Sequence, residues 1–260
     1  MTVPVVANTV VGKGVCRLVF DWGGEMPRAG QFFMIKPERT GVFLARPVSV
    51  FAGGPGELTF VVAEKGAGTK AICVMRPGEE AELIGPLGNA FADFLPGNMA
   101  GRPVALLSGG IGAAPIALFA RELRRANIDY ALFAGFKSGD AVIPMDEQPD
   151  IQAGAFRDGS GVAGNASVII TEDGSLGEKG LVTDFLVPAH YAAVFACGPL
   201  PMLRAVYRLC AASGVPCYAS METRMACGVG ACLGCRIITK QGNRRCCKDG
   251  PVFDAENIEW

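Results

Sequence analysis

The sequence predicts a protein of the α/β plus β class, with an N-terminal antiparallel β-barrel, a doubly wound parallel-sheet domain and a C-terminal cysteine-rich module. Residues 1–98 hold short β-rich segments that Gly or Pro interrupts about every ten residues. Residues 99–215 alternate buried strands with amphipathic helices, the pattern of a parallel sheet with helices on both faces. Five of the ten cysteines lie between residues 227 and 247. We therefore expect domains at 1–98, 99–215 and 216–260.

The composition excludes several classes of function. The 260 residues include 24 Lys and Arg against 25 Asp and Glu, so no basic surface for nucleic acid is expected. Hydrophobic residues make up 50% and charged residues 19%, which is typical of a chain with a large core. The first residues, "MTVPVVANTVVGKG", lack the pattern of a secretory signal, and no run of about 18 apolar residues is present. We expect a cytoplasmic protein that binds neither nucleic acid nor membrane.

In the first domain the predicted strands are "VCRLVF", "GQFFMIKP", "RPVSVFA", "GELTFVVAEKG" and "EEAELIGPLGN". Apolar and polar residues alternate in "LTFVV", as in a strand with one buried face. The one helical candidate is the short segment "GTKAICVMRPG". An antiparallel barrel or sandwich is the fold that this pattern favours.

The second domain begins with "VALLSGG", a continuous apolar run of the kind found in strands buried on both faces. "DYALFAGF", "ASVIITED" and "AAVFACGP" predict further strands. Two amphipathic helices are expected between the strands, with these residues on their buried faces: Ile116, Phe119, Ala120 and Leu123 in the first, and Met202, Ala205, Val206 and Leu209 in the second.

Two strand-to-helix turns in this domain are candidate dinucleotide sites. Ligands of such sheets bind at the carboxyl ends of the strands, where glycine lets backbone N–H groups approach a pyrophosphate. The first turn is "SGGIGAAP", in which Pro115 replaces the last glycine of G-x-G-x-x-G, so the motif alone is equally consistent with a tight packing turn. The second is "ACGPLPML". The predicted ligand residues are Gly109, Gly110, Gly112, Cys197, Gly198 and Pro199.

The cysteine-rich segment predicts a metal centre. Cys227, Cys232 and Cys235 follow C-x4-C-x2-C, and a later Cys246-Cys247 pair offers a fourth thiolate, which is the spacing of a plant-type [2Fe–2S] cluster. Structural zinc or unligated thiols are the alternatives, but zinc sites usually repeat C-x2-C or use histidines, and His190 is the only histidine. Spacing leaves both Cys246 and Cys247 open as the fourth ligand. The five scattered cysteines, Cys16, Cys73, Cys197, Cys210 and Cys217, are expected as small buried apolar residues.

Together these motifs resemble the ferredoxin–NADP reductase superfamily. "ARPVSV" looks like its Arg-x-x-Ser flavin motif, "EKGAGT" is similar to its pyrophosphate loop, and "SGGIGAAP" and "CGPLPML" are similar to its nicotinamide-dinucleotide motifs. With "ETRMACGVGACLGC" and "CKDGPVF", the resemblance covers nearly the whole chain and is closest to the electron-transfer subunits of class 1B dihydroorotate dehydrogenase.

The resemblance implies roles for individual residues. Arg46 would meet the FAD pyrophosphate, and Pro47, Val48 and Ser49 would lie along the isoalloxazine. Val48 stands where the superfamily usually has a stacking Tyr. The residues implied on the adenosine side and at a phosphate are Val62, Ala63, Glu64, Gly68 and Thr69. The family pattern also selects Cys247 as the fourth ligand, with Cys227, Cys232 and Cys235.

The function that the resemblance implies is an electron relay in pyrimidine biosynthesis. Electrons would pass from dihydroorotate to FMN in a separate catalytic subunit, then through the [2Fe–2S] cluster and FAD of this chain to NAD⁺, in a heterotetramer with two of each subunit. No acid–base residue is then required, since the cofactors carry the chemistry. NAD rather than NADP rests on the family alone, because Lys137 and Ser138 could contact a ribose or a 2′-phosphate. The alternatives are the small subunit of an NADH-dependent ferredoxin:NADP oxidoreductase or sulfhydrogenase, and a zinc-stabilised nucleotide-binding module.

Overall fold

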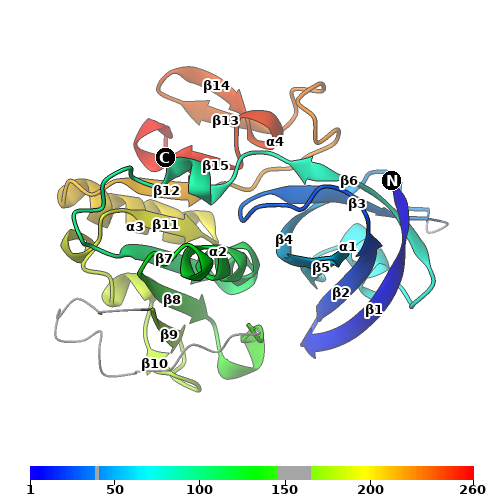
Figure 1. Ribbon diagram of the computed structural model, residues 1–260, viewed down its shortest axis with the longest axis horizontal. Coiled ribbons are helices and arrows are strands. Elements are labelled where there is room, and N and C mark those ends of the chain that lie inside the picture. Colours follow the sequence, from blue (N-terminus) through cyan, green and yellow to red (C-terminus); the bar gives the residue numbers. More distant parts are fainter. Residues whose placement is uncertain (39–40, 146–164) are drawn as a thin grey trace.

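The computed structural model describes residues 1–38, 41–145 and 165–260, and it contains a closed barrel, a mixed sheet and a C-terminal hairpin module (Figure 1). In order around the barrel, its antiparallel strands are β1 (Thr2–Gly12), β2 (Val15–Trp22), β5 (Gly56–Ala63), β4 (Arg46–Gly54), β3 (Phe32–Pro37) and β6 (Glu80–Leu87). Helix α1 (Ala67–Cys73) follows β5. The predicted antiparallel barrel is confirmed.

Alternating side chains explain why these segments close a barrel. In β2, Cys16, Leu18, Phe20 and Trp22 are buried and the residues between them are more exposed, so one face of the strand lines the core. The rings of Phe20, Phe33 and Phe60 meet edge to face inside the barrel, with centroids 5.6–5.9 Å apart. Strand β1 was not among the predicted strands.

The second sheet has seven strands. In spatial order they are β10 (Glu178–Lys179), β9 (Ala166–Thr171), β8 (Tyr130–Phe136), β7 (Val104–Gly109), β11 (Val194–Cys197), β12 (Cys217–Ser220) and β15 (Val252–Asp254). All neighbours are parallel except β12 and β15. The chain runs from β7 through β8 and β9 to one edge and then returns to β11 on the other side of β7. The topological switch point therefore lies between β7 and β11.

Helices α2 (Ala113–Arg125) and α3 (Leu200–Ala212) cover opposite faces of this sheet, because their buried residues belong to two separate core clusters. The predicted buried face of α2 is confirmed. For α3 the prediction is confirmed at Val206, but the rest of the predicted face is wrong by one position. Its buried residues are Leu203, Val206 and Cys210, whereas Leu209 is 36% exposed. On the same helix, Tyr207 stacks on Trp260, with ring centroids 5.5 Å apart.

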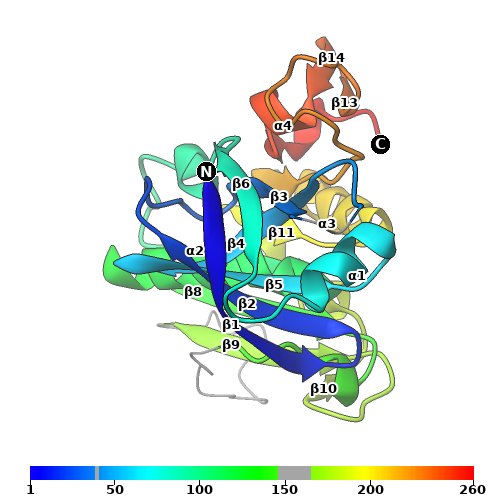
Figure 2. The same cartoon turned by 90° about the vertical axis from the view of Figure 1, so that its right-hand side faces the viewer.

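The C-terminal module crosses the top of both larger domains in Figures 1 and 2. It consists of the hairpin β13 (Arg236–Thr239) and β14 (Gly242–Arg245), the one-turn helix α4 (Cys246–Asp249) and β15, which joins the sheet of the second domain. Short 3₁₀ turns occupy Phe91–Phe94, Gly110–Gly112, Gly139–Ala141, Val182–Asp184, Pro188–His190 and Ala255–Asn257. None of the helices within the described ranges combines the length and apolar character needed to cross a membrane.

Candidate functional site

The predicted flavin residues come together where β4 meets the start of α1. The Arg46 guanidinium lies directly on Gly68, so that a Cβ at this glycine would overlap it. Arg46 Nη1 also donates to the Leu44 carbonyl at 2.7 Å. The absence of a side chain at Gly68 therefore brings a fixed positive charge against the backbone of the helix start. A charge over a glycine turn at a helix start fits the pyrophosphate of FAD.

The neighbouring predicted residues occupy different surroundings. Thr69 Oγ1 accepts the N–H groups of Lys65 and Gly66 at 2.8 and 3.1 Å and donates to the Gly66 carbonyl, which shapes the turn. Pro47 and Ser49 are half-buried, whereas Val48 is buried in the barrel core. Val62 and Ala63 end β5, and the adjacent Glu64 lies 3.9 Å from the Lys70 ammonium.

The two predicted nucleotide turns meet at the switch point of the sheet. A Cβ at Gly112 would overlap the Cys197 carbonyl, and one at Gly109 would lie 2.8 Å from Pro199 Cδ. Gly110 has a positive φ of 53°, a conformation that favours glycine. The turns after β7 and β11 therefore form one surface at the start of α2, made almost wholly of backbone. Such a surface can approach a dinucleotide closely.

Burial raises the pKa of Cys197 to about 12, while a hydrogen bond with Ser220 acts in the opposite direction. The carboxylate of Glu222 is near enough to raise this pKa as well. Glu222 is the first residue of the quoted motif "ETRMACGVGACLGC", but no role was predicted for it from the sequence. Cys197 is accordingly a neutral thiol that contributes shape and polarity to the turn.

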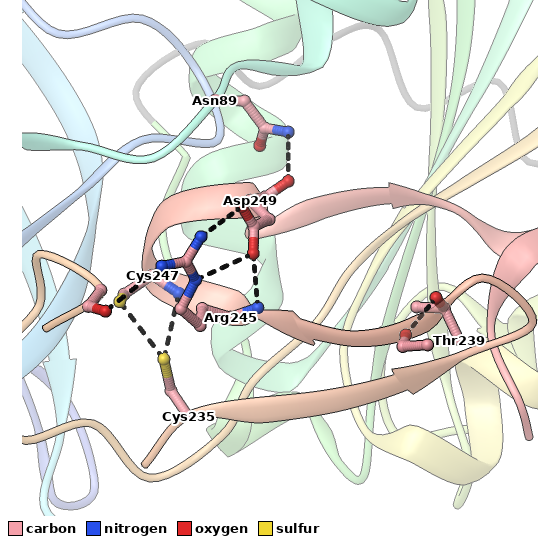
Figure 3. A network of polar contacts seen from close by, with 8 residues as sticks. Asn89, Cys235, Thr239, Arg245, Cys247 and Asp249 are labelled. Atoms are coloured by element: carbon pink, nitrogen blue, oxygen red, sulfur yellow. Dashed lines mark hydrogen bonds and ion pairs between the residues drawn. The ribbon is translucent and has the colours of Figure 1, made fainter. Parts of the chain in front are cut away.

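The four predicted cluster ligands form two pairs. Cys235 Sγ and Cys247 Sγ are 3.2 Å apart, and the Cys247 N–H points at Cys235 Sγ from 3.4 Å (Figure 3). In the other pair the Cys232 N–H points at Cys227 Sγ, also from 3.4 Å. Within the described ranges no three His, Cys, Asp or Glu side chains converge as ligands of a single metal ion. Two pairs of thiols suit a centre with two irons, which takes four thiolates.

Cys246 lies apart from these pairs. Its thiol donates to the Met221 carbonyl at 3.1 Å, and its side chain is fully buried. Burial raises the pKa of Cys246 to about 12 and that of Cys247 to about 12 as well, so position and not acidity distinguishes the two thiols. Between the two adjacent cysteines, Cys247 is therefore the one whose sulfur faces the rest of the set.

The loop around Cys227 is built to hold sulfur close to backbone. Gly228 and Gly230 have φ of 71° and 81°, and Cβ atoms there would press on Met34 of the barrel and on Lys248 of α4. The N–H groups of Cys232 and Val229 lower the pKa of Cys227 to about 6. Clustered N–H donors around a thiolate are what an iron–sulfur centre requires. The residues present thus fit a [2Fe–2S] cluster.

A polar network supports this site. Arg245 donates through Nε and Nη2 to both carboxylate oxygens of Asp249, at 3.2 and 3.3 Å, and through Nη1 to the Gly230 carbonyl at 3.4 Å. Its backbone N–H caps α4 on Asp249 at 2.7 Å. Asn89, at the exit of the barrel, bonds Val252 in both directions at 2.9 and 3.0 Å, and also contacts the Asp249 carbonyl (Figure 3). None of these three side chains was identified from the sequence.

Comparisons with known proteins agree with this geometry. Residues 222–259 match the model of the iron–sulfur cluster binding domain of dihydroorotate dehydrogenase B. The "Dihydroorotate dehydrogenase B (NAD(+)), electron transfer subunit" of Clostridium perfringens is 40% identical over 258 residues, which cover 97% of this chain and 95% of the relative. The protein of the same name from Clostridium acetobutylicum is 36% identical, covering 95% and 92%.

Solved structures show the same fold. A structure of the NADH-dependent reduced ferredoxin-NADP oxidoreductase matches 99% of this chain and 90% of its own, with a TM-score of 0.80 and 24% identity. The ferredoxin reductase of carbazole 1,9a-dioxygenase matches 83% of this chain and 65% of its own, with a TM-score of 0.65 and 23% identity. At these identities the similarity concerns the fold alone.

Proposed function

The chain belongs to the family of dihydroorotate dehydrogenase B electron-transfer subunits, and from this we propose that it passes electrons from the FMN of a catalytic subunit to NAD⁺ in pyrimidine biosynthesis. FAD and a [2Fe–2S] cluster, when bound, supply the conversion between one-electron transfer and the two-electron reduction of NAD⁺. The residues of this chain bind, orient and separate these groups.

The observation that carries the proposal is the position of the cysteine loop against the barrel. Gly228 packs on Met34 of β3 and Leu87 of β6, and Met34 lies one residue from Ile35, the register partner of Arg46. A cluster held by Cys227, Cys232, Cys235 and Cys247 would then lie beside the domain that holds the flavin. Electron transfer between the two groups needs this proximity.

Four groups of residues divide the binding of FAD and NAD(H). Arg46, Gly68 and Thr69 would hold the FAD phosphates, Pro47, Val48 and Ser49 the isoalloxazine, and Val62, Ala63 and Glu64 the adenosine side. Gly109, Gly110 and Gly112, with Cys197, Gly198 and Pro199, would bind NAD(H) at the switch point. The corresponding domains are 1–98 for FAD, 99–215 for NAD and 216–260 for the cluster.

The name of the relatives implies a catalytic partner, and we place it against the cysteine loop. Val229 and Leu233 in this loop are 53% and 67% exposed, and Cys232 is exposed between them. Apolar side chains around an exposed ligand suit a contact that excludes water from an electron path. The assembly that we propose is cytoplasmic and contains two copies of each subunit.

Two rival functions make different predictions. The small subunit of a ferredoxin:NADP oxidoreductase or of a sulfhydrogenase would bind the same cofactors without depending on dihydroorotate. A zinc-stabilised module would be colourless. The family match at 40% identity over nearly the full length favours the dihydroorotate reading over both.

An anaerobic absorption spectrum of the purified chain, before and after NADH, tests the proposal. Flavin bands with an iron–sulfur shoulder that bleach together on NADH are expected. Adding the catalytic subunit and dihydroorotate should then reduce NAD⁺. A colourless zinc protein contradicts the whole assignment, and a coloured protein that dihydroorotate and the catalytic subunit never reduce contradicts the choice of partner.

A further inference from the structure

Two thiols outside the cluster site meet at the edge of the barrel. Cys16 lies in β2, and Cys73 is the last residue of α1, 57 positions later in the chain. Their sulfur atoms are 2.7 Å apart, and both lie near the Val62 carbonyl, at 3.7 and 3.5 Å. Cys16 is buried, whereas Cys73 is partly exposed. The sequence suggested two unrelated small apolar residues.

The surrounding backbone fixes this contact. Cys16 is the register partner of Val62 in the β2–β5 pair. On the helix side, Asn8 Nδ2 donates to the carbonyls of Cys73 and Met75 at 2.9 and 2.7 Å, so β1 fastens the end of α1. Because both cysteines stand on hydrogen-bonded elements, their contact does not depend on a loose loop. Figure 2 shows α1 beside the barrel strands.

The two thiols differ in the properties that decide thiol reactivity. The hydrogen bond from Cys16 lowers the pKa of Cys73, although burial acts in the opposite direction. The hydrogen bond to Cys73 and burial both raise the pKa of Cys16, so this buried thiol keeps its proton. A partly exposed thiol with a lowered pKa, in contact with a buried thiol, has the arrangement of an attacking and a resolving cysteine.

We propose that Cys16 and Cys73 form a dithiol that hydrogen peroxide converts to a disulfide. The Cys73 thiolate attacks one peroxide oxygen, the O–O bond breaks, and the leaving hydroxide takes a proton to give water and a sulfenic acid. Cys16 then attacks the Cys73 sulfur, the S–S bond forms, and the sulfenic oxygen leaves as a second water with the Cys16 proton. The thiols lose two electrons and the peroxide gains two.

The disulfide would tie α1 to β2 next to the flavin residues. The first turn of α1 contains Gly68 and Thr69, and Val62 is the first residue of the segment assigned to adenosine. This consequence rests on the proposed function, because it concerns FAD. A cross-link at the end of a helix of seven residues restricts the opening of its first turn. We therefore expect FAD to leave the oxidised protein several-fold more slowly than the reduced protein.

The experiment treats the full chain, purified with its cofactors, with limiting hydrogen peroxide, blocks the remaining thiols and maps the peptides. A Cys16–Cys73 cross-linked peptide is expected, lighter by two hydrogens than the two reduced peptides and reversed by dithiothreitol. Cys210 and Cys217, a second close pair that is buried on both sides, are the internal control and should remain reduced. The proposal is overturned if Cys73 is oxidised without becoming linked to Cys16. It is also overturned if the control pair is oxidised before Cys16 and Cys73.

Two variants sharpen the result. Cys73→Ser should abolish the cross-link, and Cys16→Ala should leave a sulfenic acid on Cys73 that dimedone labels. The peptide map of the unmodified chain decides the question even where a variant fails to fold. FAD release is measured on the same oxidised and reduced samples, and equal rates overturn the effect on α1. A chain that never holds flavin refutes the proposed function and leaves the thiol result standing.

Discussion

Replacing Arg245 by Gln should loosen the cluster without unfolding the protein. This side chain ties helix α4 to the loop of the first three cysteines, since it bonds Asp249 on the helix that carries Cys247 and the Gly230 carbonyl in the loop that carries Cys227 and Cys232. Glutamine keeps the backbone cap on Asp249 but cannot make the two-pronged ion pair. The cysteine segments would then keep the backbone bond from Cys246 N–H to the Cys235 carbonyl at 2.8 Å, but they would lose the side-chain tie from α4 to Gly230.

The magnitude follows from exposure and from the position of the group. The Arg245 and Asp249 side chains are 34% and 26% exposed, so their ion pair contributes only about 0–1 kcal/mol to folding. Loss of a residue that supports metal ligands typically costs about 10- to 100-fold in metal affinity. This corresponds to about 1.4–2.8 kcal/mol of binding free energy. The effect should therefore appear in cluster retention and hardly in unfolding.

The assay is anaerobic transfer of iron to a coloured chelator, followed by the loss of the iron–sulfur absorbance. Arg244→Gln is the matched control, because this neighbouring arginine is exposed and its contact is a 3.5 Å hydrogen bond with Gln241. Arg245→Gln should release iron about 10- to 100-fold faster than the control, with FAD content unchanged. Equal release from the two variants would refute the reasoning.

Three further substitutions, two of them paired with a control substitution, test other parts of the site. Cys247→Ser should remove the iron–sulfur absorbance and leave FAD bound, whereas Cys246→Ser should retain both, as iron content and spectra would show. Gly68→Ala should displace the guanidinium that lies on it and weaken FAD binding about 10- to 100-fold by titration, whereas Gly66→Ala, which faces open space, should not. Asn89→Ala should lower the free energy of unfolding by about 1–3 kcal/mol in denaturant titrations, because it leaves two buried backbone groups unpaired.

Elements with a strong local pattern were predicted, and those formed by long-range pairing were not. The continuous apolar run of β7 and the helical spacing of apolar residues in α2 can each be recognised from about a dozen neighbouring residues. Strand β15 has only three residues and pairs with β12 more than 30 positions earlier in the chain. No local period distinguishes such a strand from a loop. The same limit explains why the C-terminal module was not expected to complete the larger sheet.

Site residues likewise were predicted where a local motif contains them and were missed where a long-range contact defines them. Residues that a motif names are close together in the structure, as Gly68 and Arg46 illustrate. Asn89 was missed because its partner Val252 lies 163 positions away. Arg245 carried a signal that was not used, since it stands four residues before Asp249, the spacing of an ion pair on one helical face.

The same long-range contacts explain how one chain can keep two redox groups at a constant separation. Strand β15 pairs with β12 on one side and receives Asn89 from the barrel on the other. The cysteine loop rests on Met34 of the barrel. The module is therefore attached to both larger domains, close to the cysteines themselves. Electron transfer depends steeply on separation, whereas nicotinamide exchange needs an open surface, and the switch-point turn at Gly110 is not among the contacts of this junction. The family's reaction requires both features: a fixed distance between the cluster and the flavin, and a dinucleotide surface that NAD(H) can reach and leave.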